Sequence, residues 1–164
     1  MPRKLNNRYD NFLKYVKTSL DNYNPKSTYE LLLALLSSQI DADCCLLIDK
    51  YEQILYNSPT LKETKFSHTI LKKALRKNKS FFIRNAIKDA HLKTKKSIAG
   101  NIFLSVICVV LRDKSNQIIG ALYMDRHSPD KDPFTEIDLK QAEEFVSNFT
   151  SIIISEGLEK NELN

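Results

Sequence analysis

Two long apolar stretches joined by a short polar link constrain this sequence more than any other feature. Ile102–Arg112 and Gln117–Arg126 are rich in β-branched, aliphatic and aromatic residues, a composition that favours strands. The link Asp113-Lys114-Ser115-Asn116 has the composition of a turn. The pattern therefore predicts an antiparallel hairpin built from these two strands.

Shorter elements precede the hairpin, and each is predicted from apolar spacing or from a capping residue. An amphipathic helix is predicted within residues 5–20. Ser27 and Glu30 have the spacing of a capping box, which predicts a helix from Leu31 to about Gln39. The remaining elements are strands at Ala42–Asp49, Tyr51–Tyr56 and Ser80–Arg84, a helix from the cap Ser67 to about Lys77, and a loop or broken helix over 85–100.

The last predicted element is a long helix after the hairpin. Thr135 is its candidate cap, and Phe134 is placed to pack on Leu139 as a hydrophobic staple. Apolar residues recur every three or four positions as far as Ile153, which predicts one buried stripe. The order α-α-β-β-α-β-(loop)-β-β-α indicates an α+β fold with helices packed on an antiparallel sheet.

Composition excludes several classes of protein. The 164 residues, 42% of them hydrophobic, suffice for one domain, and the 3 glycines and 5 prolines exclude collagen-like and linker-rich chains. No apolar run approaches the roughly 20 residues of a membrane span. No apolar stretch follows Met1 closely enough to form a signal peptide. We therefore expect a soluble, single-domain protein of the cytoplasm.

Candidate catalytic and metal-binding groups are few. His68, His91 and His127 are dispersed, without the spacing of metal ligands, and His68 is expected in the first turn of a helix. Asp125-Arg126-His127 is expected at the rim of the sheet, with a structural or solvent role. The sequence predicts no catalytic residue, no metal site and no cofactor.

The three cysteines do not form a disulfide framework. Cys44 and Cys45 are neighbours on a predicted strand, so their side chains should point to opposite faces. Cys108 lies in an apolar run, where a buried and unreactive thiol is expected. This pattern is typical of a protein in a reducing compartment.

Positive charge is concentrated in one segment. Residues 62–100 contain 12 basic and 2 acidic residues, a net charge of +10, whereas the whole chain has +5. Such a field favours an anionic partner: a phosphorylated small molecule, a nucleic acid or an acidic protein surface. The plainer interpretation is a solvated, lysine-rich surface. The segment has no helix-turn-helix pattern and no regularly interleaved aromatic residues, which argues against nucleic acid.

Several blocks of sequence, taken in order, resemble a known family. They are Thr69–Leu75, Ser80–Ala86, Ser105–Leu111 (SVICVVL), Ile118–Asp125 (IIGALYMD) and Phe134–Leu139 (FTEIDL). Over about residues 27–156 the chain resembles a GAF domain. It looks most similar to the GAF modules of bacterial transcription activators, cyclases and other signalling proteins.

The sequence departs from the family pattern at a few positions. Val110 stands where proline is usual, and Asn116 stands in a turn where glycine is common, a position that asparagine tolerates. Members that bind cyclic nucleotides have a pattern that Asn78-Lys79 and Phe134…Asp138 fit, but here Leu139 replaces its glutamate. The match is therefore partial and argues weakly for a cyclic nucleotide.

The resemblance implies a GAF-like, PAS-related fold. A central antiparallel sheet would have the N- and C-terminal helices on one face, and a middle helix plus a loop on the other face would enclose a small-molecule pocket. The chain then divides into an N-terminal dimer or linker helix (1–26), the GAF domain (27–156) and a polar tail (157–164). In this family the terminal helices form dimer bundles and continue into effector domains. Whether this chain stands alone remains open.

Alternation along the hairpin assigns its side chains to two faces. The apolar face, expected beneath the terminal helices, comprises Leu104, Val106, Cys108, Val110, Leu122 and Met124. The mixed face, expected to line the pocket, comprises Phe103, Ser105, Ile107, Ala121, Tyr123 and Asp125. Asn85, Lys95, Lys96 and Ser97 should wall the same pocket, where lysines or first-turn amides near Ser97 hold an anion.

These inferences predict a cytoplasmic signalling or regulatory domain that senses a small ligand, for which the charge favours an anion. It would act as a homodimer through its terminal helices or through an effector protein, without a membrane partner. A ligand-free dimerisation or interaction scaffold is the main alternative. An enzyme of the free methionine sulfoxide reductase type is a weaker alternative, because the cysteine spacing differs from that of the reductases.

Overall fold

The computed structural model describes residues 25–58, 61, 65–86, 104–128 and 130–153. Its elements are α2 (Pro25–Ile40), β1 (Cys44–Asp49), β2 (Ile54–Asn57), α3 (His68–Lys77), β3 (Phe81–Ile83), β4 (Ser105–Arg112), β5 (Ile118–Arg126) and α5 (Glu136–Ile153). The strands and helices predicted for this part of the chain are present. The helix predicted within 5–20, most of the segment 85–100 and the tail 157–164 lie outside the described residues.

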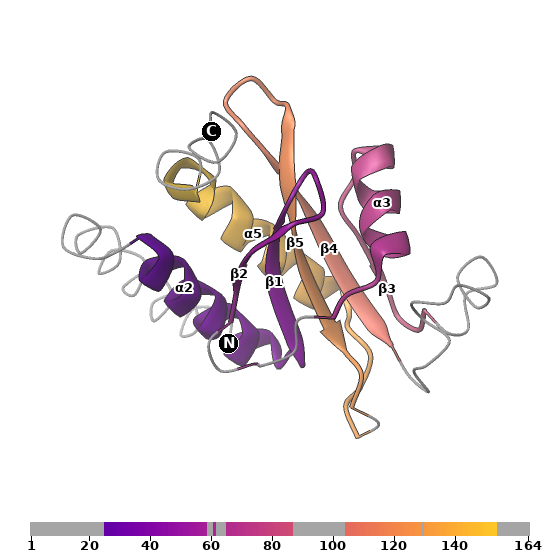
Figure 1. The fold of residues 1–164 in the computed structure, drawn as a ribbon. Helices are drawn as coiled ribbons and strands as arrows, with labels where there is room; N and C mark the ends of the chain where they lie inside the picture. The colour runs from indigo at the N-terminus through magenta and orange to yellow at the C-terminus, as the bar shows by residue number, and fades with distance from the viewer. Residues whose placement is uncertain (1–24, 59–60, 62–64, 87–103, 129, 154–164) are drawn as a thin grey trace.

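The five described strands form one sheet in the order β2-β1-β5-β4-β3, and all neighbouring strands are antiparallel. Figure 1 shows α3 on one side of this sheet and the two longer helices, α2 and α5, on the other. This confirms the predicted α+β architecture, with the C-terminal helix on one face and the middle helix on the other; the placement of the N-terminal helix lies outside the described residues. Among the described residues, no helix has both the length and the apolar composition that a membrane span requires.

Each face of the sheet carries its own hydrophobic core. The first core packs residues of α2 and α5, among them Leu32, Leu36 and Phe145, against Cys45 and Leu47 of β1. The second core packs Ile70, Leu71 and Ala74 of α3 against Cys44, Leu46, Ile48 and Tyr123. Because successive side chains of a strand point to opposite faces, β1 contributes to both cores and is apolar from Cys44 to Ile48.

The caps predicted for α3 and α5 are present. Ser67 caps α3, and its hydroxyl accepts a hydrogen bond from the Ile70 amide at 3.3 Å. At α5, the carboxylate of Asp138 accepts from the Thr135 amide at 2.8 Å, and the Thr135 hydroxyl accepts from the Asp138 amide at 3.5 Å. Aspartate thus takes the place of glutamate in the capping box.

The predicted start of α2 is wrong. The helix begins at Pro25, two residues before Ser27, so Ser27 lies inside the first turn instead of capping it. Proline suits the first turn because an N–H at that position would have no partner within the helix. Among the described side chains of α2, Tyr29 is the first that is buried.

The two hairpins of the sheet end in turns of the same construction. The first, Asp49–Gln53, joins β1 to β2, and the second, Asp113–Gln117, joins β4 to β5. In each turn the leading aspartate carboxylate accepts hydrogen bonds from the amides two and four residues later, at 2.8–2.9 Å. The fourth residue has a positive φ, 67° at Glu52 and 64° at Asn116. The same local chemistry therefore sets both turns.

A β-bulge next to the second turn decides which side chains of β4 face which helices. Arg112 pairs with Ile118, but Leu111 pairs with Gly120, so Ile119 is an extra residue in β5. Beyond the bulge the register has moved by one residue, and the side chains of β4 exchange faces relative to those of β5.

The predicted faces are therefore correct for β5 and wrong for β4. Leu122 and Met124 contact the α2/α5 core, as predicted, and Ala121 and Tyr123 contact α3. The inverted residues are Leu104, Val106, Cys108 and Val110, which belong to the α3 core, and Ile107, which belongs to the α2/α5 core. A hairpin without the bulge would have the predicted arrangement.

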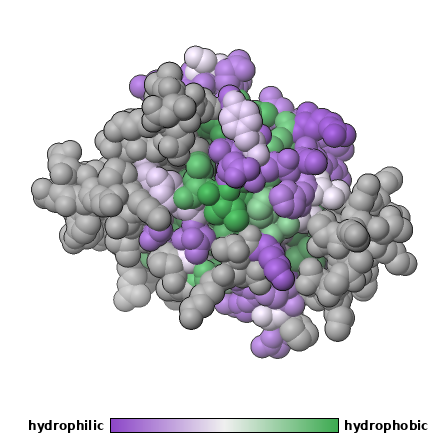
Figure 2. Space-filling view, in the orientation of Figure 1, coloured by the Kyte–Doolittle hydropathy of each residue, from purple (hydrophilic) through white to green (hydrophobic). Residues whose placement is uncertain are grey.

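Hydrophobic and hydrophilic residues are distributed unevenly over the surface of the molecule. In the space-filling view, hydrophobic residues gather near the centre, in the region of β2, and hydrophilic residues cover the outer side of α3 (Figure 2). Ile54 of the edge strand β2 is 37% exposed.

Gly120, next to the bulge, cannot be replaced without moving backbone. A Cβ atom there would lie 2.2 Å from the Ile48 carbonyl oxygen and 3.1 Å from the Asp49 Cα. We predict that Gly120→Ala lowers the free energy of unfolding by about 2–4 kcal/mol, measured by urea denaturation. Asn116→Gly is the control, since glycine accepts a positive φ, and should stay within about 1 kcal/mol of the wild type. Equal midpoints for Gly120→Ala and the wild type would contradict the close approach of β1 to β5.

Candidate functional site

The ten predicted ligand-binding residues do not form one group. Ala121, Tyr123 and Asp125 lie on the side of the sheet that faces α3, as expected. Asn85 follows β3 and is half-buried. Lys95, Lys96, Ser97 and Phe103 lie outside the described residues.

Ser105 and Ile107 lie on the other face of the sheet, and this part of the predicted site is wrong. Ile107 is fully buried in the α2/α5 core. The Ser105 hydroxyl donates to the Ile83 carbonyl at 3.0 Å and accepts from the Phe134 amide at 2.9 Å. Ser105 therefore joins β4 to β3 and to the start of α5. Both errors follow from the bulge at Ile119.

A line of hydrogen bonds connects the start of α3 to the end of β5. The Tyr123 hydroxyl accepts from the Ser67 amide at 3.2 Å and donates to one oxygen of the Asp125 carboxylate at 3.0 Å. The other Asp125 oxygen lies 2.9 Å from Nδ1 of His127. We call Ser67, Tyr123, Asp125 and His127 the polar chain. The sequence alone gave no signal for it, because Ser67 and Tyr123 are 56 positions apart.

Burial sets the electrostatics of the polar chain. Asp125 lies near the end of β5 and is 4% exposed, so of the two predicted roles, structural or solvent, the structural one applies. Burial raises the pKa of Asp125, although bonds from His127 and Tyr123 act in the opposite direction. Burial, with the nearby Asp125 charge, raises the pKa of Tyr123 well above its ordinary value, so its hydroxyl keeps its proton. At the outer end, the side chain of His127 is 35% exposed.

A cluster of charges beside the polar chain joins the end of α2 to the start of α5. Arg126 donates to the carbonyls of Ile40 and Asp41, which end α2, and to that of Asp132 before α5. Its guanidinium carbon lies 4.4 Å from the ring centroid of Phe134. Arg126 thus fixes the relative positions of the ends of both helices.

Asp43 connects this junction to the polar chain. One oxygen of its carboxylate accepts from the amides of His127 and Ser128 at 2.8 and 2.9 Å, and the other lies 2.7 Å from Nζ of Lys131. Burial acts to raise the pKa of Asp43, but the bonds from Lys131, Ser128 and His127 outweigh it and lower that pKa to about 2.

Cys45 and Cys108 do not supply a reactive thiolate. Cys44 belongs to the α3 core and Cys45 to the α2/α5 core, which confirms that they face opposite sides. Burial raises the pKa of Cys108 to about 12 and that of Cys45 further. A thiol with such a pKa stays protonated at neutral pH and is a poor nucleophile.

The histidines of the described residues have protein partners. His68 begins α3, as predicted, and its Nδ1 lies 3.1 Å from a carboxylate oxygen of Glu52. His127 contacts Asp125, as described above. Within the described ranges, no three His, Cys, Asp or Glu side chains come together as metal ligands would.

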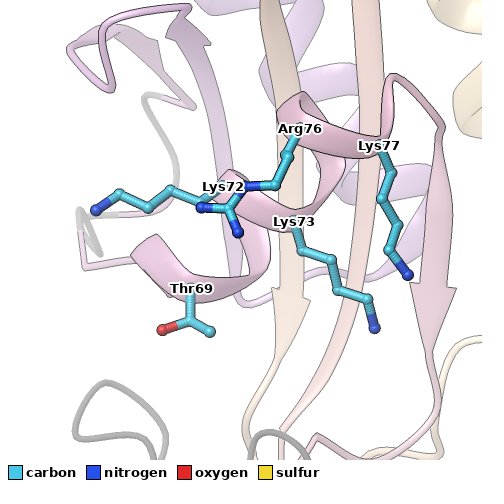
Figure 3. Close-up of a pocket in the computed structure, with 5 residues that line it drawn as sticks. All are labelled: Thr69, Lys72, Lys73, Arg76 and Lys77. Carbon is cyan, nitrogen blue, oxygen red and sulfur yellow. The ribbon is translucent and has the colours of Figure 1, made fainter.

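A basic groove runs along the outer side of α3. It has a volume of about 380 Å³, and its described lining residues are Thr69, Lys72, Lys73, Arg76 and Lys77. Figure 3 shows Lys72 and Arg76 extending to one side of the helix and Lys73 and Lys77 to the other. We call these five residues the α3 groove. The charge count located the basic segment, and the spacing of these cations along the helix is the sequence signal for their grouping. The predicted anion site at Lys95, Lys96 and Ser97 lies outside the described residues and stays a prediction.

The architecture matches solved structures of one fold. The GAF domain of a GAF/HD domain protein from Geobacter sulfurreducens aligns at 20% identity and a TM-score of 0.61, over 82% of this chain and 95% of that one. The fold is that of a GAF domain. The GAF domain of the nutrient sensor CodY from Clostridium difficile aligns at 15% identity and a TM-score of 0.59, over 92% of this chain and 97% of that one.

A third GAF domain, from an Acinetobacter phosphoenolpyruvate-protein phosphotransferase, aligns at 12% identity and a TM-score of 0.62, over 91% and 94% of the two chains. No protein-family profile matches the sequence, and no curated protein matches it. The likeness to GAF domains is therefore a likeness of fold.

The pKa of Asp43 predicts how stability depends on pH. Since its folded pKa of about 2 lies below its ordinary value of 3.8, the carboxylate stabilises the fold above the ordinary value, and this contribution is lost as the pH falls through the folded value. We predict that Asp43→Asn lowers the thermal midpoint at neutral pH, and that its difference from the wild type narrows below about pH 4 and disappears near about pH 2. The exposed Asp130, changed to Asn, is the control and should lower the midpoint little at any pH. A constant difference for Asp43→Asn across this range would contradict the assignment.

Proposed function

We propose that this chain is a regulatory sensor domain of the cytoplasm. A small ligand, for which the charge favours an anion, binds on the α3 side and alters the helices on the opposite face. The altered helices then act through a homodimer or a partner protein. The polar chain carries this proposal, because it connects the start of α3 to the junction of α2 and α5 across the sheet.

The first step is the attachment of α3 to the sheet. The Ser67 cap holds the first turn of α3, and its own amide is bound to Tyr123 of β5. A ligand that moves the start of α3 must therefore move or break this bond. Because the tyrosine hydroxyl also donates to a buried carboxylate, a displacement of the hydroxyl disturbs both hydrogen bonds at once.

The second step is transmission to the other face. From Asp125 the contacts continue through His127 to Asp43, whose carboxylate is bound to Lys131. Arg126, between Asp125 and His127 in sequence, holds the end of α2 and the approach to α5. A change at Tyr123 thus reaches both helices through a few short contacts, which are buried at Tyr123 and partly exposed from His127 onward.

The fold supports this proposal by analogy. The nutrient sensor CodY has a GAF domain of the same architecture, described as binding a cofactor. The likeness is one of fold, so ligand and partner are proposed here on the contacts of this chain's own residues.

The ligand-free scaffold is the second candidate, and one observation favours it. The α3 core is closely packed: Ile70, Leu71, Ala74 and Tyr123 are fully buried. A domain with this face filled would serve only to hold its terminal helices in a dimer or against a partner.

Removal of one hydroxyl separates the two candidates. We predict that Tyr123→Phe lowers the free energy of unfolding by about 1–3 kcal/mol, since it removes a partner from both the Ser67 amide and Asp125. Amide hydrogen exchange should then quicken in α3 and also at the end of α2 and the start of α5. Tyr56→Phe, a half-buried hydroxyl outside the polar chain, is the matched control. Faster exchange confined to α3 would contradict transmission across the sheet.

A ligand search tests the sensing role directly. Native mass spectrometry of freshly purified protein reports both the oligomeric state and any retained small molecule. A thermal-shift screen of nucleotides and organic acids should contain a compound that raises the midpoint, because a ligand at 100 times its Kd stabilises by about 2.7 kcal/mol. A dimer that retains no ligand and responds to none would favour the scaffold.

A further inference from the structure

We propose that the α3 groove is a binding site for a small molecule that carries a multivalent anionic group, such as a diphosphate. This inference deepens the proposed function and rests on it for the regulatory meaning of binding. The binding itself rests only on the groove.

The cations of the groove lie on one face of one helix. The lining positions 69, 72, 73, 76 and 77 are separated by three or four residues, which places their side chains next to each other. The helix His68–Lys77 contains no acidic residue, so it supplies no carboxylate of its own to compensate its four cations. Like charges at this spacing destabilise a helix. An anion bound between them removes this repulsion.

The two sides of the groove provide different donors. Arg76 has the planar fork that binds two oxygens of a phosphate group, and Lys72 extends beside it (Figure 3). On the other side, the ammonium group of Lys73 lies 5.5 Å from the ring centroid of Phe81 in β3, which limits the positions of its side chain. Thr69 adds a hydroxyl at one end of the row.

The dimensions and chemistry of the groove favour a small molecule. Its volume of about 380 Å³ falls in the range of small-molecule sites, roughly 300–1,000 Å³. Single-stranded nucleic acids are bound by stacking bases on aromatic side chains, and the five described lining residues include none. Several cations close together select for a ligand with more than one negative charge.

Electrostatics favour the groove over the α3 face of the sheet as the site of the anion. The α3 face of the sheet ends in the buried carboxylate of Asp125, which would repel an anion. The cations are on the outer side of the same helix whose first residue follows Ser67. An anion in the groove would therefore act on α3, and through Ser67 on Tyr123, without entering the core.

The test compares two double variants that lose the same charge. Lys72→Gln with Arg76→Gln alters the groove, whereas Lys114→Gln with Lys140→Gln removes two exposed lysines outside it. Isothermal titration with inorganic pyrophosphate is the binding assay, and acetate at equal ionic strength is the monovalent reference. We expect wild-type protein to bind pyrophosphate, the groove variant to lose at least about tenfold in affinity and the control to stay within about twofold. Without ligand, the groove variant should melt at or above the wild-type midpoint, because repulsion is reduced.

Three outcomes would overturn the proposal. They are equal losses in the two variants, no preference for pyrophosphate over acetate, or an oligonucleotide that binds in the groove more tightly than pyrophosphate does. Lys73→Gln tests the other side of the groove and should also weaken binding. The proposed function can fail while the binding site is confirmed. This is the conclusion if pyrophosphate binds in the groove but does not change hydrogen exchange in α2 and α5.

Discussion

The register of one hairpin controls the arrangement of both cores. Ile119 adds one residue to β5, and beyond it every side chain of β4 faces the opposite way from an unbulged pairing. Cys108 and Val110 consequently meet α3, and Ile107 meets α2 and α5. Gly120 follows directly and lets β1 approach β5 closely, so the bulge and the central pairing of the sheet depend on each other. The two helical layers can pack only on the faces that this register supplies.

The polar chain lies within a largely apolar interior. Buried polar groups are costly unless each finds a partner, and here Tyr123 and Asp125 satisfy each other while Ser67 and His127 satisfy their remaining atoms. A hydrophobic residue at either position would fill the same space. What the polar pair adds is a directional link between the start of α3 and the helix junction on the opposite face. That link distinguishes a domain suited to transmission from a simple packed core.

Charge is separated in the same molecule. The carboxylate of Asp125 is buried on the side of the sheet that faces α3. The opposite, outer side of α3 carries the four cations of the α3 groove. A single helix therefore lies between a buried acid and an exposed basic surface, and its first turn is held to the sheet through Ser67. In the proposed sensor, an anion bound on the outer side of α3 would act on the hydrogen bonds of the polar chain through this helix.

Local chemistry determined much of this protein from sequence alone. The hairpin, the caps Ser67 and Thr135, the opposite orientations of Cys44 and Cys45 and the GAF-like order of elements all follow from neighbouring residues, whose preferences persist in the folded chain. The tertiary structure alone decided the register of β4, because a bulge adds a residue without changing the alternating pattern. It also brought Tyr123 to Ser67 across 56 positions, since such proximity arises only when distant elements pack together.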